Sequence, residues 1–196
     1  CIRDRAEILF NRKHFDQALT DYKQLKAKAT TTERRQLAAT GMLRSAAMMQ
    51  DDVETIAAAT DMLAEAKLTP ELRNEALYFR AKAYLNQQAD KKAMNDLQAL
   101  AKDTRTLYGA EAKYLVALQL YKAHEYAAAE KEILNFIEQS TPHAYWLARS
   151  FILLSDVYVA MDKKLDARQY LLSLQQNYHA DDDIEQMINE RLEKLK

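Results

Sequence analysis

Small and large residues recur along the chain with a period of 36 to 38 residues. One position of each unit, used here as the reference for counting, is usually a small residue. It is occupied in turn by Ala18, Ile56, Ala93, Ala129 and Ala167, and is called the anchoring residue below. Large, mostly apolar residues follow four and seven positions later, as Leu97 and Leu100 follow Ala93. This spacing is typical of one face of an α-helix, so each unit is predicted to contain one amphipathic helix here.

A second helix is predicted upstream of the first in every unit. Residues on its inner face lie twelve and nine positions before the anchoring residue, as Ala81 and Tyr84 do before Ala93. Short polar segments separate the two helices, for example Arg12-Lys13-His14. In the second unit the same spacing selects Arg44 and Ala47 upstream of Ile56, and Thr60 and Leu63 downstream of it.

This arrangement resembles the tetratricopeptide repeat of bacterial proteins. Members of that family carry a small residue in the middle of the first helix and another at the start of the second, where the two backbones approach closely. The resemblance covers Ile2 to about Tyr178 and is clearest in Phe15-Asp16-Gln17-Ala18 and Tyr126-Ala127-Ala128-Ala129. It implies an all-α fold, an α-α superhelix built as a solenoid of about five helix-turn-helix units. The family period is about 34 residues, so the additional residues are expected in the connections.

The units are expected to form a single domain over residues 1–196. Beyond the fifth unit, Asp181 to Asp183 precede a segment whose apolar residues fall on one stripe, among them Ile184 and Ile188. An end face of a stacked array is covered by such a helix. The predicted boundaries are about 1–29, 30–67, 68–103, 104–140 and 141–179 for the units and 182–196 for the capping helix.

Four helix starts carry recognisable capping signals. Thr or Asp followed three residues later by Glu predicts a capping box, and Thr before Pro predicts an N-cap with proline at the first helical position. These signals are Thr30 with Glu33, Asp51 with Glu54, Thr69 with Pro70, and Thr141 with Pro142.

Composition and charge narrow the range of partners. The chain has 28 basic and 29 acidic residues and a formal net charge of −1, without the basic excess that a phosphate backbone requires. Nucleic acid is therefore not an expected partner. No apolar run approaches the roughly 20 residues that span a bilayer, so no transmembrane segment is predicted. The chain is 48% hydrophobic, which is enough for a sizeable core.

The sequence offers little support for catalysis. The four histidines lie mostly in predicted turns and lack a second ligand type at helical spacing, so no metal site is expected. Gly41 and Gly109 are too far apart to form a phosphate-binding loop. We expect neither a cofactor nor an enzyme activity.

The family resemblance instead points to a concave groove lined by the first helix of each unit. Family members expose the second, fifth, ninth, twelfth and thirteenth repeat positions there. Carried over to this chain, the residues expected to bind a protein or peptide partner are Tyr78, Lys82, Asn86, Tyr114, Leu118, Tyr121, Lys122 and Arg149. Lys82, Asn86 and Lys122 reproduce only part of the set with which some relatives hold a terminal carboxylate.

Three functional hypotheses remain open at this stage, and the weakest is an accessory domain of an enzyme, which predicts a catalytic segment upstream. The first is a non-catalytic protein-interaction scaffold that forms part of a longer chain with upstream repeats, because Ile2, Ala6 and Leu9 already lie on the inner face of a repeat helix. The alternative is an exported bacterial envelope lipoprotein acting in outer-membrane assembly, because Cys1 occupies the position that such proteins lipidate. The sequence leaves the compartment open between the cytoplasm and the bacterial periplasm or envelope.

Overall fold

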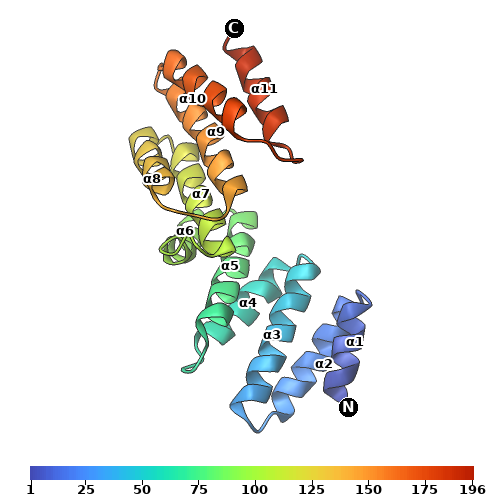
Figure 1. Ribbon diagram of the computed structural model, residues 1–196. Helices are drawn as coiled ribbons and strands as arrows, with labels where there is room; N and C mark the ends of the chain where they lie inside the picture. The colour runs from blue at the N-terminus through green and yellow to red at the C-terminus, as the bar shows by residue number, and fades with distance from the viewer. The chain divides into compact units, whose positions relative to one another are not determined.

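The computed structural model describes residues 1–196 and contains α-helices joined by short connections (Figure 1). No helix is both long and apolar enough to cross a bilayer. The predicted all-α architecture of helix pairs is confirmed. The helices are α1 (Ile2–Asn11), α2 (Phe15–Lys28), α3 (Thr32–Met48), α4 (Asp52–Leu63), α5 (Pro70–Asn86), α6 (Asp90–Leu100), α7 (Leu107–Lys122), α8 (Tyr126–Glu138), α9 (Ala144–Ala160), α10 (Lys164–Asn177) and α11 (Ile184–Lys194).

The two helices of every pair are joined by a turn of one geometry. The first helix ends in a residue with positive φ, and the following backbone N–H groups donate back into the last turn of that helix, as His14 N does to Leu9 O at 2.9 Å. Glycine is the usual residue at such a position. Here it is occupied by Lys13, Gln50, Gln88, His124 and Asp162, with φ between 56° and 64°.

The chain forms two compact units, residues 1–96 and 97–196, with the boundary inside α6. In the first unit each helix packs on the next in the chain, from α1 through α5. Contacts also link α1 with α3 and α3 with α5, whereas α2 and α4 are joined at their surfaces by the ion pairs Lys23–Glu54 and Lys26–Asp61. The first helices of the pairs therefore make an inner layer, and the second helices an outer one. Their shared core includes Ala6, Ala18, Leu43, Ala59 and Met62, all at most 1% exposed.

The second unit repeats this layering. Contacts run from α7 through α8 and α9 to α10 and α11, and further contacts link α7 with α9 and α9 with α11. The helix α11 covers apolar residues of α9 and α10, as predicted for a capping helix. Ile184 and Ile188 of α11 are buried against Ile152 and Leu171.

Burial corrects the predicted register of the second helix pair by one residue. The fourth residue of each outer helix is the buried small position, and in α4 that residue is Thr55, which is 3% exposed. Ile56 is only half-buried, so its assignment was wrong. The inner-face residues shift with it: Leu43, Ala46, Ala59 and Met62 replace Arg44, Ala47, Thr60 and Leu63. Each of the four is buried because the true period places it between the helices.

Two of the four predicted caps are confirmed and two are wrong. The side chains of Asp51 and Thr69 accept hydrogen bonds from Glu54 N and Leu72 N, as expected. The N-cap of α3 is Thr31 rather than Thr30, and it accepts from Arg34 N at 3.3 Å.

The other incorrect cap lies before α9, which begins at Ala144 after the N-cap residue His143. Thr141 therefore does not cap this helix. Its hydroxyl donates to the carbonyl oxygen of Thr104 at 2.8 Å and so ties the connection before α9 to the one before α7. Pro142 lies outside the helix, in the connection that this long-range hydrogen bond holds.

An arginine–aspartate pair recurs at the same place in the first and third helix pairs. Arg5 of α1 donates to both carboxylate oxygens of Asp21 in α2, at 2.6 and 2.5 Å. Arg80 of α5 donates to Asp96 of α6 in the same two-fold manner, at 2.8 and 2.7 Å. Both aspartates are buried, at 4% and 5% exposed. Each arginine thus supplies the compensation that a buried carboxylate needs.

Acid is expected to weaken the first of these pairs. The hydrogen bonds from Arg5 lower the pKa of Asp21, burial opposes this effect, and the charge of Arg5 adds to the lowering. A lowered pKa contributes stability that is full above the ordinary aspartate pKa of about 3.9 and is lost as the pH falls through the lowered value. The difference in unfolding free energy between wild type and Asp21→Asn should therefore shrink from pH 6 to pH 2 in urea titrations. Asp16→Asn, at an exposed position of α2, is the control, and an unchanged difference for Asp21→Asn would contradict the pairing.

Candidate functional site

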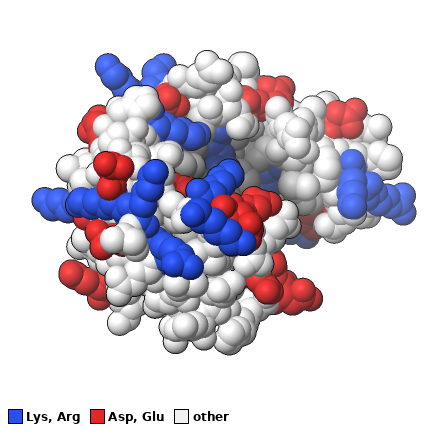
Figure 2. Space-filling view, turned by 90° about the horizontal axis from the view of Figure 1, so that it is seen from above, with Lys and Arg blue, Asp and Glu red and all other residues white.

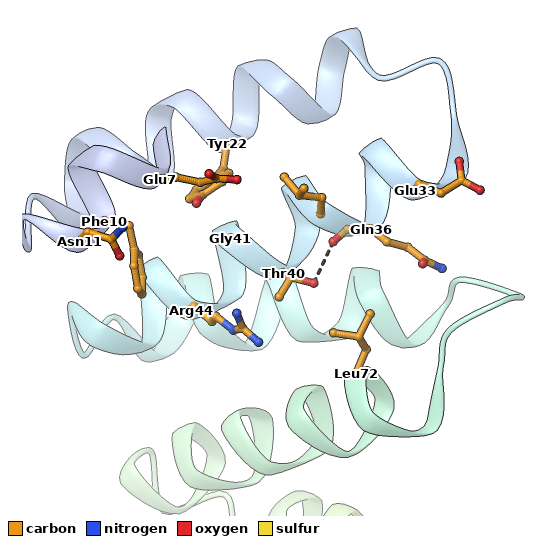
Figure 3. A pocket seen from close by; sticks show the side chains of 11 residues that line it. Glu7, Phe10, Asn11, Tyr22, Glu33, Gln36, Thr40, Gly41, Arg44 and Leu72 are labelled. Carbon is orange, nitrogen blue, oxygen red and sulfur yellow. Dashed lines mark hydrogen bonds between the residues drawn. The ribbon is translucent and has the colours of Figure 1, made fainter. Parts of the chain in front are cut away.

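The first unit contains a pocket of about 680 Å³ along the inner side of α3 (Figure 3). This volume lies within the range of about 300–1,000 Å³ that is usual for ligand sites. Figure 3 shows side chains from α1, α2, α3 and α5 around the space. The lining residues are Glu7, Phe10, Asn11, Tyr22, Glu33, Gln36, Leu37, Thr40, Gly41, Arg44 and Leu72.

Most of this lining follows from the concave positions of the repeat once the register is corrected. With Leu43 at the eighth position of the second unit, the second, fifth and ninth positions are Leu37, Thr40 and Arg44. In the first unit the ninth, twelfth and thirteenth positions are Glu7, Phe10 and Asn11, which line the same pocket. We missed these residues from sequence because the concave positions were carried over only to the later units. The repeat spacing in the first two units would have identified them.

The absence of a side chain at Gly41 shapes the floor of this pocket. A Cβ atom at Gly41 would lie 2.4 to 2.5 Å from three ring atoms of Tyr22. The ring of Tyr22, which comes from α2, therefore lies directly against the backbone of α3. Burial of Tyr22 raises the pKa of its hydroxyl; the negative charge of Glu7 adds to this, and Arg44 acts in the opposite direction. The ring is thus a fixed apolar surface beneath a charged rim.

The single guanidinium of the rim already has an acidic partner. Arg44 donates to both carboxylate oxygens of Glu75 in α5, at 2.5 and 2.9 Å. The carboxylate of Glu7 is half-exposed and lies 3.7 Å from Arg3, while Glu33 at the start of α3 is exposed. The charge that this pocket presents to an incoming group is therefore negative.

Three of the residues predicted to bind a partner lie on α5 in the first unit. Tyr78 and Lys82 are half-buried neighbours, with Lys82 Nζ 5.8 Å from the centre of the Tyr78 ring. Asn86 is exposed at the end of the helix, where its amide donates to Asp52 at 3.0 Å. The structure thus brings Tyr78 and Lys82 together and directs Asn86 toward the preceding helix pair.

The other five predicted residues lie on α7 and α9 in the second unit. Tyr114 is 6% exposed, and its hydroxyl accepts a hydrogen bond from Arg149 of α9 at 3.1 Å. Arg149 also donates to Tyr145 at 2.9 Å, and its guanidinium lies 5.1 Å from the centre of the Tyr114 ring. Tyr114 packs on Trp146 at 5.5 Å. Tyr114 and Arg149 are therefore hydrogen-bonded to each other, although Nε of Arg149 is buried without a partner, and Tyr114 is not an open contact surface.

Leu118, Tyr121 and Lys122 continue along α7 toward its C-terminal end. Leu118 and Tyr121 are half-buried and Lys122 is exposed. Burial raises the pKa of Tyr121, the charges of Asp156 and Tyr126 add to the increase, and Arg191 opposes it. These three residues are the accessible part of the predicted set in this unit.

Charged side chains of both signs are interspersed over the surface. Figure 2 shows blue and red side chains side by side on the visible face. Of the histidines, His124 shares a hydrogen bond with Tyr126 at 2.7 Å and His143 shares one with the carbonyl of Arg105 at 3.0 Å. No group of three or more His, Cys, Asp or Glu side chains is arranged to hold a metal ion.

Comparison with known proteins finds likeness in structure rather than in sequence. No protein-family model matches the chain, and no curated protein matches it significantly. The structure is similar to the C-terminal part of a TPR repeat-containing protein from Cytophaga hutchinsonii, with a TM-score of 0.67 and 12% identity over 89% of this chain. This chain spans 64% of the length of that solved chain. A tetratricopeptide repeat protein from Parabacteroides merdae matches with a TM-score of 0.48 and 14% identity, covering 96% of this chain and 82% of that one.

The Cytophaga match and the layered helix pairs agree on one architecture. At 12% identity this similarity shows a shared fold and does not indicate a shared partner. The inner and outer layers, the buried small position at the start of each outer helix, and the covering helix α11 were each expected from the repeat pattern. This chain has the fold of the bacterial tetratricopeptide repeat proteins, an all-α solenoid of helix pairs.

Proposed function

We propose that this chain is a non-catalytic scaffold that binds a peptide or protein partner along the concave side of its helix pairs. The observation that carries the proposal is the composition of the inner helices. Their concave positions combine aromatic rings, lysines and carboxylates, and a preformed pocket lies among them. Folds built from this repeat generally serve protein interaction, and stacked helix pairs offer extended surfaces for it.

Three members of the predicted set that are half-buried or exposed provide the test. Tyr78→Ala, Tyr121→Ala and Lys122→Ala should be combined in one variant, which leaves the buried Tyr114 in place. Tyrosine rings supply much contact area at little cost in conformational entropy, so their loss should remove most of the affinity for the partner. The measurement is crosslinking of the complete protein to its natural partner, identified by mass spectrometry, followed by titration of the purified pair.

A matched control is Lys131→Ala in the outer helix α8, which removes a lysine from an exposed position outside the concave face. The control should bind as wild type does. Equal affinity of the concave triple variant and wild type, with helical circular dichroism unchanged in both, would exclude the concave face as the binding surface.

A further inference from the structure

The pocket along α3 has features that go beyond a general interaction surface and indicate the chemistry of its occupant. This inference rests on the proposed function and names the partner class for one part of the concave face. The pocket is built from the first two helix pairs and the start of α5, all within the first unit. It is preformed, because its floor is fixed by the Tyr22 ring against Gly41.

The dimensions favour a short extended segment. Arg44 and Glu33 line the two ends of the pocket on α3, and the eleven helical steps between them span about 16 Å. An extended chain advances about 3.3 Å per residue, so roughly five residues of a peptide would lie along the groove. Extended chains dock through alternate side chains, which leaves two or three of them directed into the pocket.

The lining specifies what those side chains should be. Phe10, Tyr22, Leu37 and Leu72 supply apolar surface, and Leu37 is 37% exposed. An apolar or aromatic side chain of the partner would cover Leu37 and remove that surface from water.

The rim specifies the flanking charge. Glu7 and Glu33 present carboxylates, whereas the one guanidinium, Arg44, is held by Glu75 through two hydrogen bonds. Glu7 already has a long surface ion pair with Arg3, but Glu33 has none, so the rim would repel an acidic peptide and attract a basic one. We infer that this pocket binds an extended peptide segment in which an apolar or aromatic residue is flanked by lysine or arginine.

Selection from a random heptapeptide library displayed on phage tests the inference on the complete protein. Peptides enriched on wild type should carry Lys or Arg beside an apolar residue. They should be lost on Thr40→Phe, which fills the pocket, and on Leu37→Lys, which adds a repelling cation. Thr20→Phe is the matched control, because Thr20 makes the same hydrogen bond to the carbonyl four residues earlier but lies on α2 outside this pocket.

Affinity measurements on one selected basic peptide sharpen the result. The double variant Glu7→Gln with Glu33→Gln should bind it about 3- to 30-fold more weakly, because each exposed ion pair contributes a modest amount. Added salt should weaken binding to wild type and have less effect on the double variant. Unaltered affinity in the double variant would overturn the charge assignment.

The outcomes separate this inference from the proposed function. Selected peptides without basic enrichment, or peptides that bind Thr40→Phe as well as wild type, would overturn the inference. If those same peptides are lost on the combined Tyr78, Tyr121 and Lys122 variant, the concave scaffold stands and only the assignment of the pocket fails. Failure to select any peptide, together with an unaffected natural partner in the concave triple variant, would overturn both.

Discussion

Arg80→Ala is expected to lower the free energy of unfolding by about 3–5 kcal/mol, because it leaves a buried carboxylate without its cation. Asp96 is 5% exposed, and the side chain of Arg80 is itself only 19% exposed. Arg80 also donates to Thr60 at 3.1 Å, so its loss would break a link to α4 as well. Urea unfolding followed by helical circular dichroism measures the change.

The equivalent pair at Arg5 and Asp21 provides a matched comparison. Its aspartate is equally buried, but the side chain of Arg5 is 63% exposed. Water can therefore reach the carboxylate when the arginine is removed, and Arg5→Ala should cost only about 1 kcal/mol. The double variant Arg80→Met with Asp96→Leu should recover most of the stability lost in Arg80→Ala, because no buried charge remains. Equal losses in the two single variants would show that burial of the arginine is not the deciding factor.

Gly109→Ala is expected to destabilise the second unit by roughly 2–4 kcal/mol, the sum of overpacking and a lost helix cap. A Cβ atom at Gly109 would lie 1.9 Å from the carbonyl oxygen of Asp103 and 2.8 Å from the hydroxyl of Thr106. The obstruction is backbone, so no rotamer change relieves it. The loop before α7 would have to move, and the hydrogen bond from Gly109 N to the Thr106 hydroxyl, 3.0 Å long, would be strained or lost.

Gly41→Ala is the control for this prediction, because both glycines lie within helices. At Gly41 the obstruction is the buried ring of Tyr22, which is side chain rather than backbone, so local repacking can relieve part of the clash. Alanine also favours helix over glycine by about 1 kcal/mol, which offsets part of the cost. Thermal unfolding should therefore show a larger loss for Gly109→Ala, with faster hydrogen exchange concentrated in α7. A larger loss for Gly41→Ala would contradict this account.

The repeat phase was accessible from sequence because side-chain size alone encodes it. Ala18, Ala93, Ala129 and Ala167 are each fully buried, since the paired backbones leave no room for more. The second pair was misplaced by one residue because Thr55 substitutes for alanine and is followed closely by Ala57-Ala58-Ala59. A run of small residues fits more than one frame, and only the packing decides between them.

The caps show the same limit at a finer scale. Three consecutive threonines, Thr30 to Thr32, precede α3, and each could serve as its N-cap. Thr141 has the expected sequence context of a cap, but its hydroxyl bonds to a carbonyl 37 residues earlier in the chain. Local sequence contains no information about such a partner, which exists only once two connections have been brought together by folding.

For the candidate site, the sequence predicted which residues occupy concave positions. It did not predict which of their side chains already pair with a neighbouring helix. Tyr114 and Arg149 looked accessible from their repeat positions, and they are in fact each other's partners. The pocket along α3 depends on the corrected frame of the second pair and on the contact of Tyr22 with Gly41, a tertiary detail. Repeat numbering therefore predicts which residues face inward, while pairing between neighbouring helices determines which remain free to meet a partner.

The left-handed residues that end the inner helices have a consequence for the evolution of this protein. Each has a positive φ, which glycine adopts at a lower energetic cost, and all five residues are exposed. Small increases in the free energy of unfolding are thus still available at these five positions. Because the positions are well separated, the increases would add independently. Replacing these five residues by glycine would therefore raise the stability of the fold, as adaptation to a higher temperature requires. Such changes would leave every residue on the inner faces of the helix pairs unaltered.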